Sequence, residues 1–191
     1  MATKNDIISL PDSHLHNRSR RVTVINDEIL KIIADMQSAT LDWEASRKHE
    51  VGVALAAIQI DQPYRIIAIR NNFDDKSDRT FSIFINPEIV KLEGEIEEDF
   101  EGCLSVPDIY GKVPRYEKIR MRALNEKGQE VRVRAEGFLA RVLQHEVDHT
   151  KGLTFVDHIK DTPAAFYKLK SDGKLEKLDY EKVKKTDLFW D

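Results

Sequence analysis

Two histidines and a glutamate lie close together in the segment His145-Glu146-Val147-Asp148-His149. On an α-helix, side chains four residues apart lie on the same face, so the imidazoles of His145 and His149 can bind one cation. Glu146 would project beside them, where its carboxylate can act on a water molecule. The alternative is a charged helix face with a core histidine, but the rest of the predicted helix is apolar, and buried ionisable groups are costly without a partner. The pattern therefore favours a metal site.

A catalytic metal site needs a third protein ligand and an open position. Downstream, one class of zinc proteases would require a histidine where this chain has Phe155, and the spacing of His158 fits no such pattern, so we expect His158 to be a polar loop residue. Upstream lies Cys103, the single cysteine of the chain. A lone cysteine is usually a small buried hydrophobe. Cys103, however, follows a glycine that permits close backbone approach, and one cysteine with two histidines suits Fe²⁺, Zn²⁺, Ni²⁺ or Co²⁺.

Three segments resemble the signature motifs of the peptide deformylase family. Gln144–His149 resembles Q-H-E-x-D-H, Glu101–Ser105 resembles E-G-C-L-S without a mismatch, and Gly52–Gln59 resembles G-x-G-x-A-A-x-Q. One departure lies at Ala54, where the family usually has a second glycine. A left-handed backbone would cost alanine roughly 1–2 kcal/mol, so we expect an extended backbone at Ala54, with its methyl group narrowing the substrate groove.

The resemblance implies a hydrolase that removes the N-formyl group from the N-terminal methionine of new polypeptides and releases formate. It implies that Cys103, His145 and His149 hold one divalent ion, typically Fe²⁺, which Zn²⁺, Ni²⁺ or Co²⁺ can replace in a recovered sample. The implied catalytic residues are Glu146 as general base and acid, with the side chain of Gln59 and the backbone N–H of Leu104 as oxyanion donors. The implied substrate-binding residues are Gly52, Val53, Ala54, Glu101, Gly102, Phe138, Arg141 and Val142.

Two side chains near these motifs have roles that the sequence leaves less defined. The stem of Arg141 could line the pocket or extend outward to solvent. Asp148 cannot easily reach the same ion, so we expect it to support the site by contacting a residue around the ion or to form a salt bridge along its own helix.

The implied partners are N-formyl-methionyl nascent peptides, with the ribosome near its exit tunnel as a further candidate. The net charge of −4 and the lack of a dense basic run argue against sequence-specific nucleic-acid binding. The first ten residues resemble neither a signal nor a transit sequence, and no run of about 18 apolar residues occurs. A single cysteine excludes an intramolecular disulfide. We therefore expect a cytoplasmic protein that does not enter the membrane.

Helical periodicity from about Asn26 to Glu50 predicts a helix near the N-terminus, which Asn26 or Asp27 would cap. The residues expected on its apolar side are Ile29, Leu30, Ile33, Met36 and Gln37. Two β-rich runs, Tyr64–Arg70 and Phe81–Ile85, predict short strands, and the polar residues 71–80 between them predict a loop.

Apolar residues alternate with arginines over residues 119–123, and with arginines again over residues 131–135. Lys127-Gly128 supplies a turn between them, so this region predicts a hairpin with one face in water. From Gly137 the apolar period changes from two to 3.6, which predicts a helix that ends near Gly152. The residues expected on its apolar face are Phe138, Leu139, Val142, Leu143 and Val147.

Strands followed by a largely buried helix favour an α+β fold, with antiparallel sheets packed around a central metal-binding H-E-x-x-H helix and with an N-terminal helix. We expect residues 1–159 to form the catalytic domain. Residues 160–191 would be an appendage docked on the same domain, with a structure that the sequence leaves open and a turn at Ser171–Gly173. The aromatic residues through which it would dock are Phe166, Tyr167, Tyr180, Phe189 and Trp190.

Two other functions stay open at this point. A metallopeptidase that cuts internal peptide bonds would use the same helix, and only Cys103 and Gln59 argue against it. A non-catalytic protein stabilised by a metal would generally need four protein ligands. The sequence offers three, together with the general-base candidate Glu146.

Overall fold

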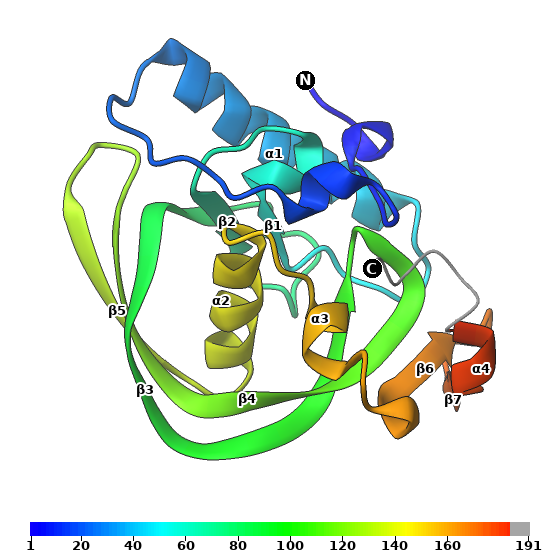
Figure 1. Cartoon of the computed structure of the whole chain (residues 1–191). Coiled ribbons are helices and arrows are strands. Elements are labelled where there is room, and N and C mark those ends of the chain that lie inside the picture. Colours follow the sequence, from blue (N-terminus) through cyan, green and yellow to red (C-terminus); the bar gives the residue numbers. More distant parts are fainter. Residues whose placement is uncertain (184–191) are drawn as a thin grey trace.

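The computed structural model describes residues 1–183 of the 191-residue chain. Its centre is the helix α2 (Gly137–His149), which lies inside the curve of the long strands β3 (Phe81–Cys103) and β4 (Val106–Leu124) and of β5 (Glu130–Glu136) (Figure 1). The predicted α+β fold, with antiparallel strands around this central helix, is confirmed. All strands of the described chain belong to one sheet, whereas the sequence suggested more than one.

The remaining strands extend this sheet at both ends. Beyond β3 lie β2 (Ile66–Arg70) and β1 (Ala54–Ala56), and every pairing is antiparallel. Because side chains alternate along a strand, β2 contributes Ile66 and Ala68 to an apolar cluster with the helix α1 (Asp27–Ala45), and Ile67 and Ile69 to a second cluster with α2. The segment Gly52–Gln59, which contains β1, also contributes residues to both clusters, so it is held between them.

The helix α1 (Asp27–Ala45) begins where the sequence predicted it to begin. Asn26 caps it, since its side chain accepts a hydrogen bond from the N–H of Ile29 at 3.1 Å. The helix ends at Ala45 rather than near Glu50, because the polar residues after it offer no apolar face to bury. Leu30 was assigned wrongly to the buried side: it is 44% exposed. The buried stripe instead includes Ile32, Ala39 and Trp43, while Gln37 is half-buried.

The strand β3 is much longer than the run Phe81–Ile85 predicted from its residues. The continuation to Cys103 is rich in acids and lacks an apolar alternation, so sequence patterning missed it. Its partner strand stabilises it through ion pairs across the ladder, such as Arg120 Nε to Glu93 Oε2 at 2.6 Å. Register shifts along the β3–β4 ladder are the irregularities that bend such a sheet, here around α2.

The predicted β4–β5 hairpin is confirmed. Ile119 pairs with Ala135 and Met121 with Val133, and these side chains are buried or half-buried toward α2. Gly128 has φ +75°, a left-handed conformation that glycine adopts without strain.

The helix α2 ends at His149, and Gly152 follows with φ +80°, as its glycine predicted. The first turn differs from the prediction, since Phe138 is 48% exposed and Leu139 is 39% exposed. From Ala140 to His149 every residue is buried. The motif residues are therefore enclosed, whereas the start of the helix faces outward.

The described part of the C-terminal segment extends the same sheet. After α3 (Phe155–Ile159), β6 (Phe166–Leu169) pairs with β4 at Ile109–Gly111, and β7 (Leu175–Lys177) pairs with β6. Phe166 is fully buried, and Tyr167 packs edge-on against Phe100 with ring centroids 4.8 Å apart. The predicted turn at Ser171–Gly173 is present.

The other helical elements are short. Single 3-10 turns lie at Lys4–Asp6, Ser13–His16, Ala57–Ile60 and Pro163–Ala165, and α4 spans Tyr180–Val183. Phe189 and Trp190 lie outside the described residues, as does the side chain of Tyr180, so docking through these aromatic residues stays a prediction. The division of the chain into a catalytic domain and an appendage after residue 159 also stays a prediction. Within residues 1–183, no helix is long and apolar enough to cross a membrane.

Candidate metal centre and active site

One sulfur atom and two imidazole nitrogens converge at the end of β3. Cys103 Sγ lies 3.3 Å from His149 Nε2, which lies 3.2 Å from His145 Nε2, and all three residues are buried. A tetrahedral ion with bonds of about 2.0–2.1 Å to nitrogen and about 2.3 Å to sulfur holds such atoms roughly 3.3–3.6 Å apart. The spacing therefore fits one shared cation.

Two buried polar atoms beside this group have no hydrogen-bond partner among the described residues, His149 Nδ1 and Glu146 Oε2. Burial raises the pKa of Glu146 to about 7. A carboxylate without a partner at a cavity wall is suited to contact a ligand or a water molecule near the cation, because an unpaired buried polar group is otherwise costly. The donor set and this orphaned carboxylate both fit a metal ion.

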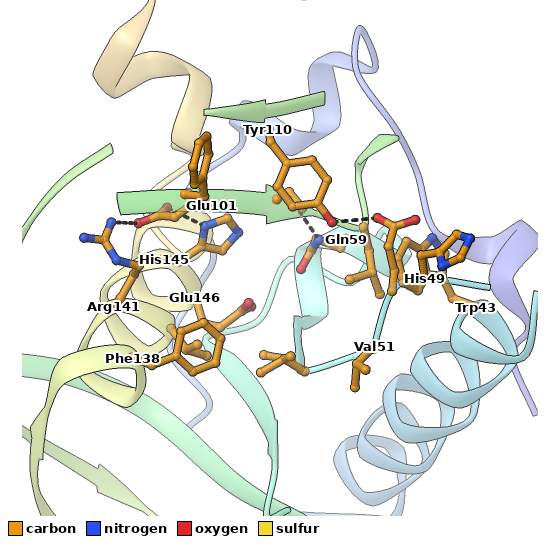
Figure 2. A pocket seen from close by; sticks show the side chains of 18 residues that line it. Trp43, His49, Val51, Gln59, Glu101, Tyr110, Phe138, Arg141, His145 and Glu146 are labelled. Atoms are coloured by element: carbon orange, nitrogen blue, oxygen red, sulfur yellow. Dashed lines mark hydrogen bonds and ion pairs between the residues drawn. The ribbon is translucent and has the colours of Figure 1, made fainter. Parts of the chain in front are cut away.

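Glu101 fixes the orientation of His145. Its Oε2 atom lies 2.9 Å from His145 Nδ1, and its Oε1 atom lies 3.0 Å from Arg141 Nη1 (Figure 2). It also pairs with Arg115. Burial disfavours the Glu101 carboxylate, yet the hydrogen bonds from His145 and Arg115 outweigh this and lower its pKa to about 2. When Nδ1–H donates to this carboxylate, Nε2 is left to bind the metal.

The two histidines have opposite electrostatic environments. Burial opposes the charged form of His145, but the hydrogen bonds with Cys103 and Glu101 outweigh it and raise its pKa well above the ordinary value. Burial and the charge of His145 hold the pKa of His149 well below that value. A cation that binds here must displace the proton of His145, so metal binding releases protons.

Asp148 lies outside the ligand group. Besides a local salt bridge with Lys151 at 3.1 Å, it pairs with residues from other elements. Its Oδ2 atom lies 2.5 Å from Arg115 Nη1 and 2.8 Å from His158 Nε2. The prediction that His158 is a loop residue was wrong: it belongs to α3, and tertiary packing brings it to Asp148. Because Arg115 also pairs with Glu101, this chain of contacts links α3 to the histidine that faces the cation site.

Gln59 lies in the 3-10 turn Ala57–Ile60 after β1, next to the sulfur atom of Cys103. Its Oε1 atom accepts from the N–H of Ala56 at 2.8 Å, which fixes the direction of the amide. Its Nε2 atom donates to Ser105 Oγ at 3.0 Å and to Cys103 Sγ at 3.4 Å. Leu104 lies in the turn between β3 and β4, directly after Cys103. The amide nitrogen of Gln59 thus lies against the sulfur of the candidate ligand Cys103.

A cavity of about 270 Å³ opens onto this centre. In Figure 2, His145, Glu146, Phe138 and Arg141 lie at one end on α2, and Val51, His49 and Trp43 lie at the other. Most of the predicted substrate-binding residues line it, namely Val53, Ala54, Glu101, Gly102, Phe138, Arg141 and Val142. A cavity whose lining includes the candidate ligands Cys103 and His145 suits the terminus of a linear substrate.

A family model described as polypeptide deformylase matches residues 4–164. The chain belongs to the peptide deformylase family. Its relatives include peptide deformylase 1 of Ralstonia nicotianae, which is 41% identical over 154 residues, covering 81% of this chain and 85% of the relative. The peptide deformylase of Thermomicrobium roseum is 40% identical over 164 residues, covering 84% and 89%.

Solved deformylase structures share the fold. A peptide deformylase from Legionella pneumophila superposes with a TM-score of 0.72 at 37% identity, covering 83% of this chain and 86% of that one. A peptide deformylase from Synechococcus elongatus in complex with actinonin gives 0.72 at 34%, covering 80% and 78%. The family match ends at residue 164, before β6, so the C-terminal strands of this deformylase lie outside it.

The motif Gly52–Gln59 differs in part from the role that the resemblance implied. Gly52 does not line the cavity; its N–H donates to Glu44 Oε2 at 3.0 Å, and a Cβ atom here would come within 2.8 Å of Thr40. Gly52 therefore fastens the motif to α1. Ala54 lies in β1, paired with Ile69, and has the extended backbone that we expected.

Arg141 is anchored inside the deformylase fold and does not extend to solvent. Its Nη1 atom donates to Glu101 Oε1 at 3.0 Å and to the carbonyl of Val113 at 2.7 Å, and its Nη2 atom donates to the carbonyl of Glu97 at 2.8 Å. It joins α2 to β3 and β4 and holds Glu101 in place.

Sequence reasoning missed the far end of the cavity. Tyr110 from β4 donates a hydrogen bond to Glu50 Oε1 at 2.9 Å, and its ring packs on Gly102, where a Cβ atom would come within 2.6 Å of it. Sequence reasoning also missed Arg115, which pairs with Glu101 and Asp148. Neither Tyr110 nor Glu50 carries a spacing signal, because tertiary structure alone brings them together.

Proposed function

We propose that this deformylase hydrolyses the N-formyl group of formyl-methionyl peptides at the Cys103, His145 and His149 centre. The observation that carries the proposal is the convergence of these three ligand atoms beside the unpartnered carboxylate of Glu146 at the wall of a cavity. The family and its named relatives support the reaction, which releases formate and a free terminal amine.

A divalent metal held by Cys103, His145 and His149 would act as a Lewis acid toward the formyl oxygen and lower the pKa of a water molecule. We infer Fe²⁺ as the native ion, since a thiolate with two imidazoles suits it and the family resemblance implies it; Zn²⁺, Ni²⁺ or Co²⁺ would occupy the same donors. The buried Glu101 supports this set by keeping Nε2 of His145 directed at the ion.

Glu146 would transfer the proton. Its carboxylate accepts a proton from water as the water oxygen bonds to the formyl carbon, and it then gives that proton to the methionine nitrogen as the carbon–nitrogen bond breaks. A pKa raised to about 7 by burial suits both steps, because a general acid–base works best near the operating pH.

Gln59 and Leu104 would stabilise the oxyanion. The Gln59 amide is fixed through Ala56 and Ser105, and its contact with Cys103 Sγ beside the cation site supports this role. The backbone N–H of Leu104 is the second donor. Each donor of this kind typically contributes ~10²–10³ in rate.

The methionine side chain would lie between Val53, Phe138 and Val142, which line the α2 end of the cavity. The Glu101–Arg141 pair lies behind them. Both charges of this pair are matched, so an apolar side chain next to them leaves no charge unpaired. Gly102 and Ala54 would border the peptide backbone.

We further propose that the substrates are nascent chains and that the enzyme acts in the cytoplasm near the ribosomal exit tunnel. Residues 1–159 would form the catalytic domain, with residues 160–191 docked on it. The near balance of charge, 30 basic against 34 acidic side chains, supports action on peptides rather than on nucleic acid.

The deciding experiment loads the protein with Fe²⁺ without oxygen and supplies formyl-Met-Ala-Ser beside its acetylated and unblocked forms. We expect stoichiometric formate and free amine from the formyl peptide, and no change in the others. Cleavage of internal peptide bonds in all three would instead identify a metallopeptidase. Tight metal binding without any hydrolysis would identify a metal-stabilised binding protein.

A further inference from the structure

A second cavity, of about 360 Å³, borders the catalytic one. Trp43 and Leu104 line both cavities. Leu104 directly follows the candidate ligand Cys103, and Trp43 lies at the end of the catalytic cavity away from His145 and Glu146 (Figure 2). The two cavities therefore share a boundary formed by Trp43 and Leu104.

The lining of the second cavity contains two cationic side chains, Lys4 and Arg47, and no acidic one. Neutral hydrogen-bonding groups come from Asn5, Ser9 and Ser46. The backbone N–H of Lys4 donates to Asp42 at 2.9 Å, which holds the residue in place, while its ammonium group forms no ion pair with any of residues 1–183. The lining is thus complementary to negative charge.

Arg47 is fixed at the boundary between the cavities. Its guanidinium carbon lies 5.1 Å from the centroid of the Trp43 ring. Its Nη1 atom pairs with Asp108 at 2.8 Å and with Glu50 at 3.7 Å, and neither acid lines the second cavity. Because Asp108 is about half exposed, solvent weakens this pairing, and the Arg47 side chain remains part of the cavity lining.

We propose that the second cavity binds the part of the substrate that follows its first two residues, and that Lys4 and Arg47 make the enzyme favour an acidic segment there. This inference rests on the proposed function, and it adds a preference for one class of nascent chain. An extended chain advances about 3.3 Å per residue, so the residues after the formyl-methionine reach the Trp43 and Leu104 boundary within a short segment.

The kinetic test compares formyl-Met-Ala-Ser-Asp-Glu with formyl-Met-Ala-Ser-Lys-Lys, and uses formyl-Met-Ala as the short reference. For the wild-type enzyme we expect kcat/KM to be roughly three- to fivefold higher on the acidic peptide at low salt, with the ratio approaching one at high salt. Lys4→Glu should remove or reverse the preference and leave the short peptide unaffected.

Lys48→Glu is the matched control, because Lys48 is exposed nearby and lines neither cavity. It changes the net charge equally and should keep the preference. Equal kcat/KM for both long peptides, or an equal effect of the two variants, would overturn the inference.

A second readout does not depend on turnover. Calorimetry on the metal-loaded protein with the product peptides Met-Ala-Ser-Asp-Glu and Met-Ala-Ser-Lys-Lys should give tighter binding of the acidic one, and Lys4→Glu should abolish the difference. Failure to hydrolyse formyl-Met-Ala would refute the proposed function alone. Equal binding of both product peptides would refute the acidic preference alone.

Discussion

The two ends of the catalytic cavity are built differently. At the metal end, Glu101, Arg115 and Asp148 are buried and paired with one another or with a histidine, so a change to one partner leaves a charge uncompensated. At the far end, the Tyr110–Glu50 contact is only partly buried. A group that loses its partner there can turn to water. The metal end is therefore intolerant of change, whereas the far end can vary at low cost.

The largest effect should come from Cys103→Ala. It removes the single sulfur donor, and the two imidazoles that remain cannot complete the proposed ligand set. We expect loss of both bound metal and deformylation, measured by elemental analysis of the purified variant and by formate release. Undiminished metal content would refute the ligand assignment. A thermal melt of both metal-free proteins separates loss of the ligand from loss of the fold.

The next largest effect should come from Glu146→Gln, which keeps the size of the side chain but cannot accept a proton. We expect wild-type metal content and a fall in kcat of ~10²–10⁴. Glu136→Gln, at the exposed cap of the same helix, is the control and should retain full activity. Full activity of Glu146→Gln would refute its role as the base.

The same carboxylate should determine how activity depends on pH. Burial raises its pKa to about 7 in the protein without a bound cation, so acidification protonates the base, and kcat/KM should fall on the acidic side. A bound cation favours the carboxylate and moves this limb to lower pH. A profile of the wild-type enzyme between about pH 5 and about pH 9 tests it. If kcat/KM fell only on the alkaline side, the proposed role of the Glu146 carboxylate in the pH dependence would be wrong.

Glu101→Gln tests the paired network. The variant leaves Arg115 and Arg141 without their shared carboxylate, which should cost about 3 kcal/mol of unfolding free energy. It also weakens the contact that orients His145, so metal affinity should fall ~10–100-fold. Glu98→Gln, exposed on the same strand, should change neither. Chemical denaturation and metal titration measure both quantities, and wild-type values for Glu101→Gln would show that the network is dispensable.

The metal end was also the part that the sequence predicted best. The i, i+4 spacing of His145 and His149 follows from helix geometry, and Cys103 was identified through the resemblance of its segment to a family motif, so these residues needed no tertiary information. The network behind them did need it: Arg115 comes from a strand whose acidic partner strand shows no β pattern, and His158 comes from a separate helix. The expected narrowing of the groove by Ala54 stays a prediction.

At the far end, Tyr110→Phe should have the smallest effect. It removes only the hydroxyl that donates to Glu50, and Glu50 keeps its ion pair with Arg47 at 3.7 Å and gains access to water. A neutral intramolecular hydrogen bond contributes about 0.5–1.5 kcal/mol net, so we expect a loss of unfolding free energy within that range and kcat/KM on formyl-Met-Ala within about threefold of wild type. Denaturation and steady-state kinetics on both proteins measure this. A loss as large as that of Glu101→Gln would mean that the Tyr110–Glu50 contact holds the cavity in shape as strictly as the metal end does, and the contrast between the two ends would fail.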